Sequence, residues 1–238
     1  MEHIAKRFGN VHALADASME VNANEIVAVV GDNGSGKSTL IKILAGTLKP
    51  DSGSIIIRDR EYRSLTPAQA LKCGIAAVYQ DLALDNYRDS AGNIFLGREL
   101  TGGGMLRSQA MRRQAERLLQ DLNIRIPDIS MPVGYLSGGQ RQGVAVARAL
   151  LAEQQLIIFD EPTAAMGVRE SASVLTLIRE LPQRGLSAIV VSHNLFQVFN
   201  IAQRIYVLRH GRVIGNVATV DSSPEAVHRM ITEASEDD

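Results

Sequence analysis

Short apolar runs recur along the chain and are separated by stretches in which apolar residues return at helical spacing. The clearest runs are residues 26–30, 75–79, 156–159 and 188–191. A run of four or five apolar residues that is bounded by polar ones is typical of a buried strand. Because such runs alternate with helical patterns, we predict an α/β fold with a mostly parallel sheet and helices packed on it.

Polar side chains follow these predicted strands. Gln80 comes directly after the second run, Asp160 and Glu161 come directly after the third, and His193 lies two residues beyond the fourth. In open parallel sheets, ligands bind beyond the carboxyl ends of the strands. We therefore expect these side chains to meet in one crevice, although they are far apart in the sequence.

The first run leads directly into a phosphate-binding loop. The residues are Gly31-Asp32-Asn33-Gly34-Ser35-Gly36-Lys37-Ser38 and then Thr39, and the first eight match G-x-x-x-x-G-K-[ST] in full. Glycines let backbone N–H groups close around phosphate oxygens, and a helix start adds unpaired donors. Lys37 reaches the β- and γ-phosphates, and Ser38 offers a hydroxyl to Mg²⁺. The pattern predicts a site for a nucleoside triphosphate; the alternative is a Gly-rich turn with a surface lysine.

The pattern changes between residues 80 and 136. Gly102–Gly104 predicts a flexible or tight turn. After it, one face of a predicted helix carries the apolar residues Met111, Ala115, Leu118, Leu119 and Leu122. On the other face, Arg112 and Glu116 are spaced for i,i+4 pairing. We expect a small helical subdomain at approximately residues 85–151, inserted in a core of 1–84 and 152–238; the alternative is an ordinary surface helix of the core.

The C-terminal part of the chain predicts an antiparallel β element and a final helix. Beyond a predicted helix at 195–203, strands are expected at 204–208 and 212–217, joined by a turn at His210-Gly211. Ser223 and Pro224 then have the residue types of a cap and first position of a last helix.

Composition and charge exclude several classes of protein. A length of 238 residues suits one domain with a small subdomain, and a formal net charge of −1 gives no electrostatic reason to expect nucleic acid. Cys73 is the only cysteine, which excludes a disulfide framework and a thiolate metal site and fits a reducing, cytosolic setting. No apolar stretch approaches the length of a membrane span. We expect a protein that is soluble, or attached to a membrane only through a partner.

A second helix start also has the composition of an anion-binding surface. Leu136-Ser137-Gly138-Gly139-Gln140 precedes a helical pattern rich in Ala, Val and Arg. A serine and two glycines could by themselves simply cap a helix. The chain thus has two helix starts that could grip phosphate, but only one acidic pair suited to magnesium, Asp160-Glu161, which is followed by Pro162-Thr163.

These motifs, in this order, resemble the ATP-binding subunit of ABC transporters. The resemblance covers nearly the whole chain and rests on the phosphate loop, Gln80, residues 136–140, residues 160–163 and His193. Five segments further resemble the bacterial monosaccharide importers of the fructose or ribose type: 79–82, 93–99, 136–142, 143–149 and 164–168. The combination is more specific than any single motif.

The resemblance implies a role for each site residue. Phe8 corresponds to the aromatic residue that stacks on adenine, although it could instead be a core phenylalanine. Asp160 would hold Mg²⁺ through water, and Glu161 would be the general base; a buried ion pair is the alternative for these two. Gln80 would contact Mg²⁺ and the attacking water and would sense the transport subunit. His193 would contact the γ-phosphate.

The resemblance also implies an assembly. Ser137, Gly138, Gly139 and Gln140 of one chain would close over ATP on the phosphate loop of a second chain, in a head-to-tail homodimer. Membrane permease subunits would dock near Gln80 and residues 81–97, and a periplasmic or extracellular sugar-binding protein would act indirectly. The chain would lie on the cytoplasmic face of the inner membrane. Two departures stand out: Gly167 replaces the aspartate of many relatives, and most monosaccharide-importer ATPases fuse two such domains.

Other classes of function remain as alternatives at this point. One is a soluble ABC-type ATPase of DNA repair or translation, although the coiled-coil insertions, zinc-binding cysteines and basic linkers of that class are absent from the sequence. Another is a P-loop nucleotide kinase, which would need an acceptor site in place of the motif at residues 136–140. A third is a module that only binds nucleotide, although the presence of Glu161 and His193 argues against it.

Overall fold

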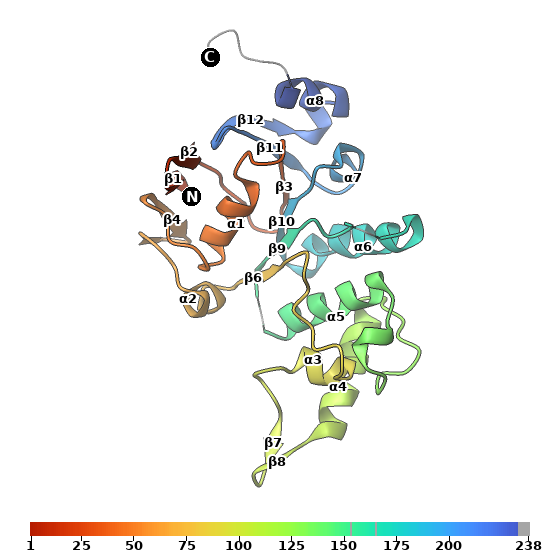
Figure 1. Ribbon diagram of the computed structural model, residues 1–238. Coiled ribbons are helices and arrows are strands. Elements are labelled where there is room, and N and C mark those ends of the chain that lie inside the picture. The colour runs from red at the N-terminus through yellow and green to blue at the C-terminus, as the bar shows by residue number, and fades with distance from the viewer. Residues whose placement is uncertain (153, 165, 233–238) are drawn as a thin grey trace.

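The computed structural model describes residues 1–152, 154–164 and 166–232, shown as a ribbon in Figure 1. The strands of this part of the chain are β1 (Glu2–Phe8), β2 (Val11–Ala17), β3 (Ile26–Val30), β4 (Ser52–Ile57), β5 (Arg60–Tyr62), β6 (Ile75–Val78), β7 (Thr101–Gly102), β8 (Met105–Leu106), β9 (Leu156–Asp160), β10 (Ser187–Val191), β11 (Arg204–Arg209) and β12 (Arg212–Ala218). The α-helices are α1 (Lys37–Leu44), α2 (Pro67–Lys72), α3 (Ser90–Ile94), α4 (Ser108–Asp121), α5 (Gly138–Leu151), α6 (Val168–Glu180), α7 (Leu195–Phe199) and α8 (Pro224–Thr232).

The main sheet combines a parallel part with an antiparallel part. Its strand order is β5-β4-β1-β2-β12-β11-β3-β10-β9-β6. Strands β11, β3, β10, β9 and β6 pair in parallel, whereas β1, β2, β4 and β5 pair antiparallel, as do β11 and β12. The predicted α/β fold with an antiparallel element is therefore confirmed, and the four apolar runs are neighbouring strands.

The parallel strands are buried because helices cover both of their faces. All residues of β3 and β10 are buried. Ile26, Ala28 and Val30 contribute to a core shared with α5, α6, α7 and α8. Val27 and Val29 point the other way, into a core shared with α1 and α2. A strand with apolar residues on both faces reads as an unbroken apolar run, which explains why the pattern is continuous rather than alternating.

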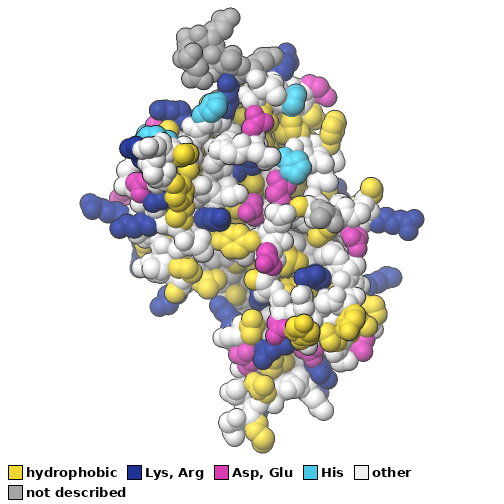
Figure 2. All heavy atoms as spheres, in the orientation of Figure 1, with side chains coloured by type: hydrophobic (Ala, Val, Ile, Leu, Met, Phe, Trp, Pro, Cys, Tyr) yellow, Lys and Arg dark blue, Asp and Glu magenta, His cyan; other side chains and the backbone are white. Residues whose placement is uncertain are grey.

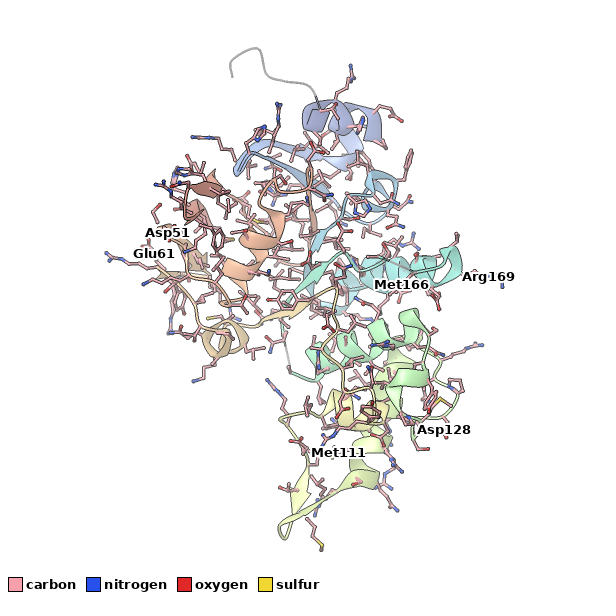
Figure 3. The ribbon with its side chains drawn as sticks, viewed as in Figure 1. Asp51, Glu61, Met111, Asp128, Met166 and Arg169 are labelled. Carbon is pink, nitrogen blue, oxygen red and sulfur yellow. The ribbon has the colours of Figure 1, made fainter. Side chains whose placement is uncertain are left out.

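Helices α3, α4 and α5 pack together beside the sheet, below it in the view of Figure 1, with the β7–β8 hairpin at their far end. Met111, which Figure 3 labels within this group, is buried together with Ala115 and Leu119, as the apolar face predicted. The glycine turn is tight, since Gly103 and Gly104 have φ of 59° and 80°. The division at residues 85–151 stays a prediction.

Two local predictions are wrong. Arg112 does not pair with Glu116; its guanidinium reaches Asp89, with Nη2 3.0 Å from Oδ2. The helix predicted at 195–203 ends at Phe199, because the chain turns to enter β11: the Gln203 amide donates to the Ile26 carbonyl at 2.9 Å. Propensity along one segment could not reveal either of these contacts with distant parts of the chain.

The C-terminal helix and the charged surface agree with the sequence pattern. The Ser223 hydroxyl accepts the Ala226 amide at 3.2 Å, so the predicted cap of α8 is confirmed. No helix of the described residues is long and apolar enough to cross a membrane. On the face that Figure 2 shows, the described basic and acidic side chains are interspersed.

A partly buried ion pair joins the amino-terminal ends of β3 and β11. The guanidinium of Arg204, the first residue of β11, contacts Glu25 through Nε–Oε1 at 2.5 Å and Nη2–Oε2 at 2.9 Å. Burial alone would raise the pKa of Glu25, but the hydrogen bonds from Arg204 and from the Asn22 amide outweigh it and hold this pKa below its ordinary value. The ionised carboxylate therefore stabilises the fold.

Replacing this carboxylate should destabilise the protein in a pH-dependent way. We expect Glu25→Gln to lower the free energy of unfolding at pH 7 by about 2 kcal/mol, because the partly buried guanidinium of Arg204 loses the charge of its nearest carboxylate and keeps only the more exposed carboxylate of Glu20. Since the folded pKa is lowered, this stabilisation is present above the ordinary pKa of 4.5 and is lost as pH falls through the folded value. Urea unfolding from pH 7 to pH 3 measures it. Asp16→Asn, in the exposed pair with His3, is the control and should cost less than about 1 kcal/mol.

Candidate functional site

The phosphate loop joins the end of β3 to the start of α1, and neighbouring backbone presses against it. A Cβ atom on Gly31 would lie 2.0 Å from the Leu208 carbonyl oxygen, and one on Gly36 would lie 2.4 Å from that of Ala13. Both glycines also have positive φ, 149° and 109°, so no other residue fits either position without moving the loop. The turn between β11 and β12 also contacts the loop, because the Gly211 amide donates to the Ser35 carbonyl at 3.0 Å.

Two polar groups of the loop are suited to a phosphate ligand. The Lys37 ammonium donates to the carbonyls of Gly31 and Asp32, both at 2.7 Å, and burial lowers its pKa against the opposing effect of Glu161 and Asp32. The Ser35 hydroxyl is buried and has no hydrogen-bond partner among the described residues. A buried polar group without a partner is costly, so this hydroxyl and the lysine together fit an anionic oxygen ligand.

Glu161 and His193 meet at the carboxyl ends of β9 and β10. These strands pair in parallel with Asp160 opposite Val191, and the Glu161 amide donates to the Val191 carbonyl at 2.9 Å. As a result, Glu161 Oε1 lies 2.9 Å from His193 Nδ1. Glu161 has φ of 51°, a conformation that residues other than glycine adopt at some cost and that often marks a functional site. The parallel register thus joins two of the predicted catalytic residues.

Asp160 is the partly buried carboxylate of this site. Burial, followed by the negative charge of Glu161, raises its pKa, whereas Lys42 and Lys37 lower it. A bound cation would offset both of these effects, so the surroundings of this carboxylate suit a magnesium ligand. Ser38, the second residue of α1, is exposed. The donors are oxygens, which Mg²⁺ prefers.

Gln80 and Phe8 lie at the periphery. Gln80 is exposed, two residues beyond the end of β6, and β6 pairs with β9 in parallel; the described residues show no hydrogen bond from its side chain. Phe8 ends β1 and is 49% exposed, so it is not a core residue, and its ring is accessible to a base. Lys6 Nζ lies 5.7 Å from the ring centroid and 2.7 Å from Asp51 Oδ1, and the contact with Asp51 could not be predicted from the sequence. Figure 3 labels Asp51 beside β4, far along the chain from β1.

Residues 137–140 begin helix α5. The Ser137 hydroxyl accepts the Gln140 amide at 3.4 Å, and the Gln140 Oε1 accepts the Ser137 amide at 3.0 Å, which is a capping box. Gln140 Nε2 also donates to the Arg125 carbonyl at 2.8 Å, so its side chain is occupied within its own chain. Gly138 packs against Met166, which lies between α5 and the start of α6 (Figure 3).

The start of α5 and the phosphate loop are not brought together within this chain. Helices α1 and α5 lie in separate parts of the molecule in Figure 1. A cavity of about 900 Å³, lined by Met19, Ile75, Leu156 and Tyr206 among others, opens near the amino ends of the parallel strands, away from the phosphate loop. The candidate site thus lies at the carboxyl ends of the parallel strands, and Asp32, Asn33 and Gly34 of its phosphate loop are exposed.

Comparison with known proteins identifies the family. A family model described as "ABC transporter" matches residues 14–164. The xylose/arabinose import ATP-binding protein XylG of Sulfolobus acidocaldarius is 44% identical over 96% of this chain and 91% of its own length. The chain belongs to the ABC transporter family. As a member, this ABC protein is an ATPase. The resemblance to the ATP-binding subunit of ABC transporters is therefore confirmed.

Two further relatives differ in length from each other. The fructose import ATP-binding protein FrcA of Rhizobium meliloti is 44% identical over 88% of this chain and 84% of its own length. The ribose import ATP-binding protein RbsA of Hahella chejuensis is 40% identical over 91% of this chain but only 43% of its own length. The ABC ATPase described here therefore spans less than half of that ribose protein and most of the other two.

Solved structures show the same fold. A nucleotide-free ATP-binding cassette from an ABC transporter aligns with a TM-score of 0.82 at 26% identity, over 98% of each chain. The dimeric, post-hydrolysis ATP-binding cassette MJ0796 bound to ADP and Pi aligns with a TM-score of 0.77 at 25% identity, over 92% of this chain and 97% of that one.

One of the segments that resemble the monosaccharide importers, 164–168, is described only in part, because Ala165 lies outside the described residues.

Crowding at the first glycine of the loop should make it intolerant of a side chain. We expect Gly31→Ala to weaken binding of a fluorescent ATP analogue at least about tenfold, because the new methyl group would overlap the Leu208 carbonyl. Gly104→Ala is the matched control: Gly104 also has positive φ, but nothing lies within 4 Å of its Cβ position. Its affinity should change less than about twofold. Equal effects of both changes would contradict the crowding argument.

Proposed function

We propose that this ABC ATPase powers the import of a monosaccharide through a membrane permease. The observation that supports it is the similarity to XylG and FrcA, which extends over most of the length of both partners in each comparison and is not restricted to the phosphate loop. Both of those relatives are sugar import proteins by name. The proposed import direction and substrate class thus come from relatives that match most of the chain.

Hydrolysis is assigned to the carboxyl ends of β3, β9 and β10. Glu161 is the proposed general base: it would take a proton from the attacking water, while His193, 2.9 Å from its carboxylate, would orient it and contact the γ-phosphate. Lys37 would leave the loop carbonyls for the β- and γ-phosphates. Mg²⁺, bound by Ser38, Gln80 and, through water, Asp160, would neutralise phosphate charge. Phe8 would stack on the adenine.

The active assembly is proposed to be a head-to-tail dimer. Helix α5 begins with Ser137 and the two following glycines in a different part of the molecule from the phosphate loop (Figure 1), and residues 32–34 of that loop are exposed. A second copy could place its own α5 start over that loop, and the matched cassette MJ0796 is dimeric by its title. The permease would dock near Gln80 and residues 81–97, and a sugar-binding protein would deliver the substrate from outside.

The other classes have less support. A role in DNA repair or translation is not favoured, because XylG and FrcA, which match most of the chain, are import proteins by name and because the net charge is −1. A nucleotide kinase would need an acceptor site where α5 begins. The ATPase of a sugar importer therefore remains the function that the chain supports best, on the cytoplasmic face of the inner membrane.

Removing the proposed base should stop both hydrolysis and transport. We expect Glu161→Gln to lower kcat for ATP hydrolysis about 10²–10⁴-fold while nucleotide binding persists. In vesicles that contain the co-purified permease, uptake of radiolabelled xylose, arabinose, fructose or ribose should stop as well. Glu116→Gln, the same chemical change on the exposed face of α4, should alter neither. Parental hydrolysis by Glu161→Gln would refute the assignment, and hydrolysis without uptake of any monosaccharide would refute the substrate class.

Mixing two inactive variants should restore hydrolysis if two chains share each site. Lys37→Ala disables the phosphate loop, and Ser137→Arg blocks the start of α5. In an equal mixture, half of the dimers are mixed and each has one intact composite site, so about a quarter of parental activity should return. Steady-state phosphate release measures it. A mixture as inactive as its parts, with the parental protein monomeric in Mg-ATP, would exclude a shared site.

A further inference from the structure

The turn after Gln80 has an unfavourable backbone conformation. Ala83 has φ of 48°, in the left-handed region that residues with a Cβ atom rarely adopt. One contact within the turn supports it, since the Ala83 amide donates to Asp81 Oδ1 at 3.2 Å. An alanine keeps such a conformation only where the surroundings impose it, and the position three residues away holds a proposed catalytic side chain.

A second contact that holds this turn comes from Arg148 in helix α5. Its Nη1 donates to the Ala83 carbonyl at 2.8 Å, and its Nη2 donates to the Leu82 carbonyl at 2.9 Å. The guanidinium is partly buried, and burial lowers its pKa. Among the described residues it pairs with no carboxylate, so its hydrogen bonds go to this turn. A guanidinium fork matched to two successive carbonyls fixes direction as well as distance.

The far end of the turn, at Asn86, is also held by α5 and by the residues that precede this helix. Arg141 Nη2 donates to Asn86 Oδ1 at 3.2 Å, and the Gly134 amide donates to the Asn86 carbonyl at 3.1 Å. Residues 82–86 therefore lie along α5, attached near its first turn and again by Arg148. From Gly138 to Arg148 the helix spans about 15 Å.

Helix α5 begins with Ser137–Gly139, and through Arg148 it also makes the contacts that shape the turn next to Gln80. We propose that Arg148 is a positioning residue for hydrolysis, which holds the turn after Gln80 in its strained form and ties the place of Gln80 to that of α5. A displacement of α5 by a partner chain at its start would then reach Gln80 of the same chain. This inference rests on the proposed role of Gln80.

The test compares two arginines of the same group of helices. Arg148→Met removes the fork but keeps an unbranched chain of similar length. We expect kcat for ATP hydrolysis to fall at least about tenfold while KM for ATP stays within about twofold, since the phosphate loop and Phe8 are untouched. Arg112→Met is the control: it loses two hydrogen bonds, both to Asp89, and touches no part of the turn. Its kcat should stay within about twofold of the parental value.

A second substitution separates positioning from general stability. In the Arg148→Met background, Ala83→Gly removes the backbone penalty of the left-handed conformation, so kcat should recover at least about threefold. Amide hydrogen exchange of residues 81–86 should be faster in Arg148→Met but not in Arg112→Met. If Arg148→Met folds poorly, Arg148→Lys, which has one ammonium in place of the fork, should give the same direction of change in kcat.

The outcomes distinguish this inference from the proposed function. An inactive parental protein would count against the function itself. An active parental protein whose kcat is unchanged in Arg148→Met, or in which Ala83→Gly gives no recovery, would overturn the role of Arg148 alone. A rise in KM without a change in kcat would also overturn it, because it would place Arg148 in nucleotide binding.

Discussion

The parallel pairing of β3, β10 and β9 is the constraint on which the site depends. Each strand is buried on both faces, so its register cannot slip without exposing apolar side chains or breaking the ladder. With the register fixed, the phosphate loop, the acidic pair and His193 emerge at one edge of the sheet. The 2.9 Å contact between Glu161 and His193 is a direct consequence, since Asp160 stands opposite Val191.

Several groups at this edge are held in states that are unfavourable by themselves. The pKa of Lys37 is lowered by burial, the pKa of Asp160 is raised by burial and by Glu161, and Glu161 has positive φ. A triphosphate with its cation would offset these costs, because it offers negative oxygens to the lysine and positive charge to the carboxylate. The site is thus arranged for a ligand that carries both signs of charge. The Arg204–Glu25 pair, which stabilises the fold, lies at the opposite ends of the strands from these groups.

The packing of α5 gives the site its second level of organisation. The helix begins with a capping box, so Ser137 and Gln140 have a structural function whatever ligand they meet. Its later turns contact the segment that follows Gln80. A single rigid element therefore touches the region where a partner chain is proposed to bind and the turn beside a proposed catalytic residue, which is a physical route for communication between half-sites.

The sequence by itself determined the parallel strands, the phosphate-loop motif and the family, and it named the candidate site residues, because each depends on a pattern of residue types: continuous apolar runs, glycines at fixed spacing and polar residues at strand ends. Phe8 could not be assigned to core or surface in this way, since exposure depends on what packs around the end of β1. Only the tertiary structure decided that Arg112 pairs with Asp89, that α7 stops at Phe199 and that Arg148 grips the turn at Ala83. Those contacts join residues separated by 23 to 65 positions or depend on the next strand, and the spacing of residue types carries no information about such distant partners.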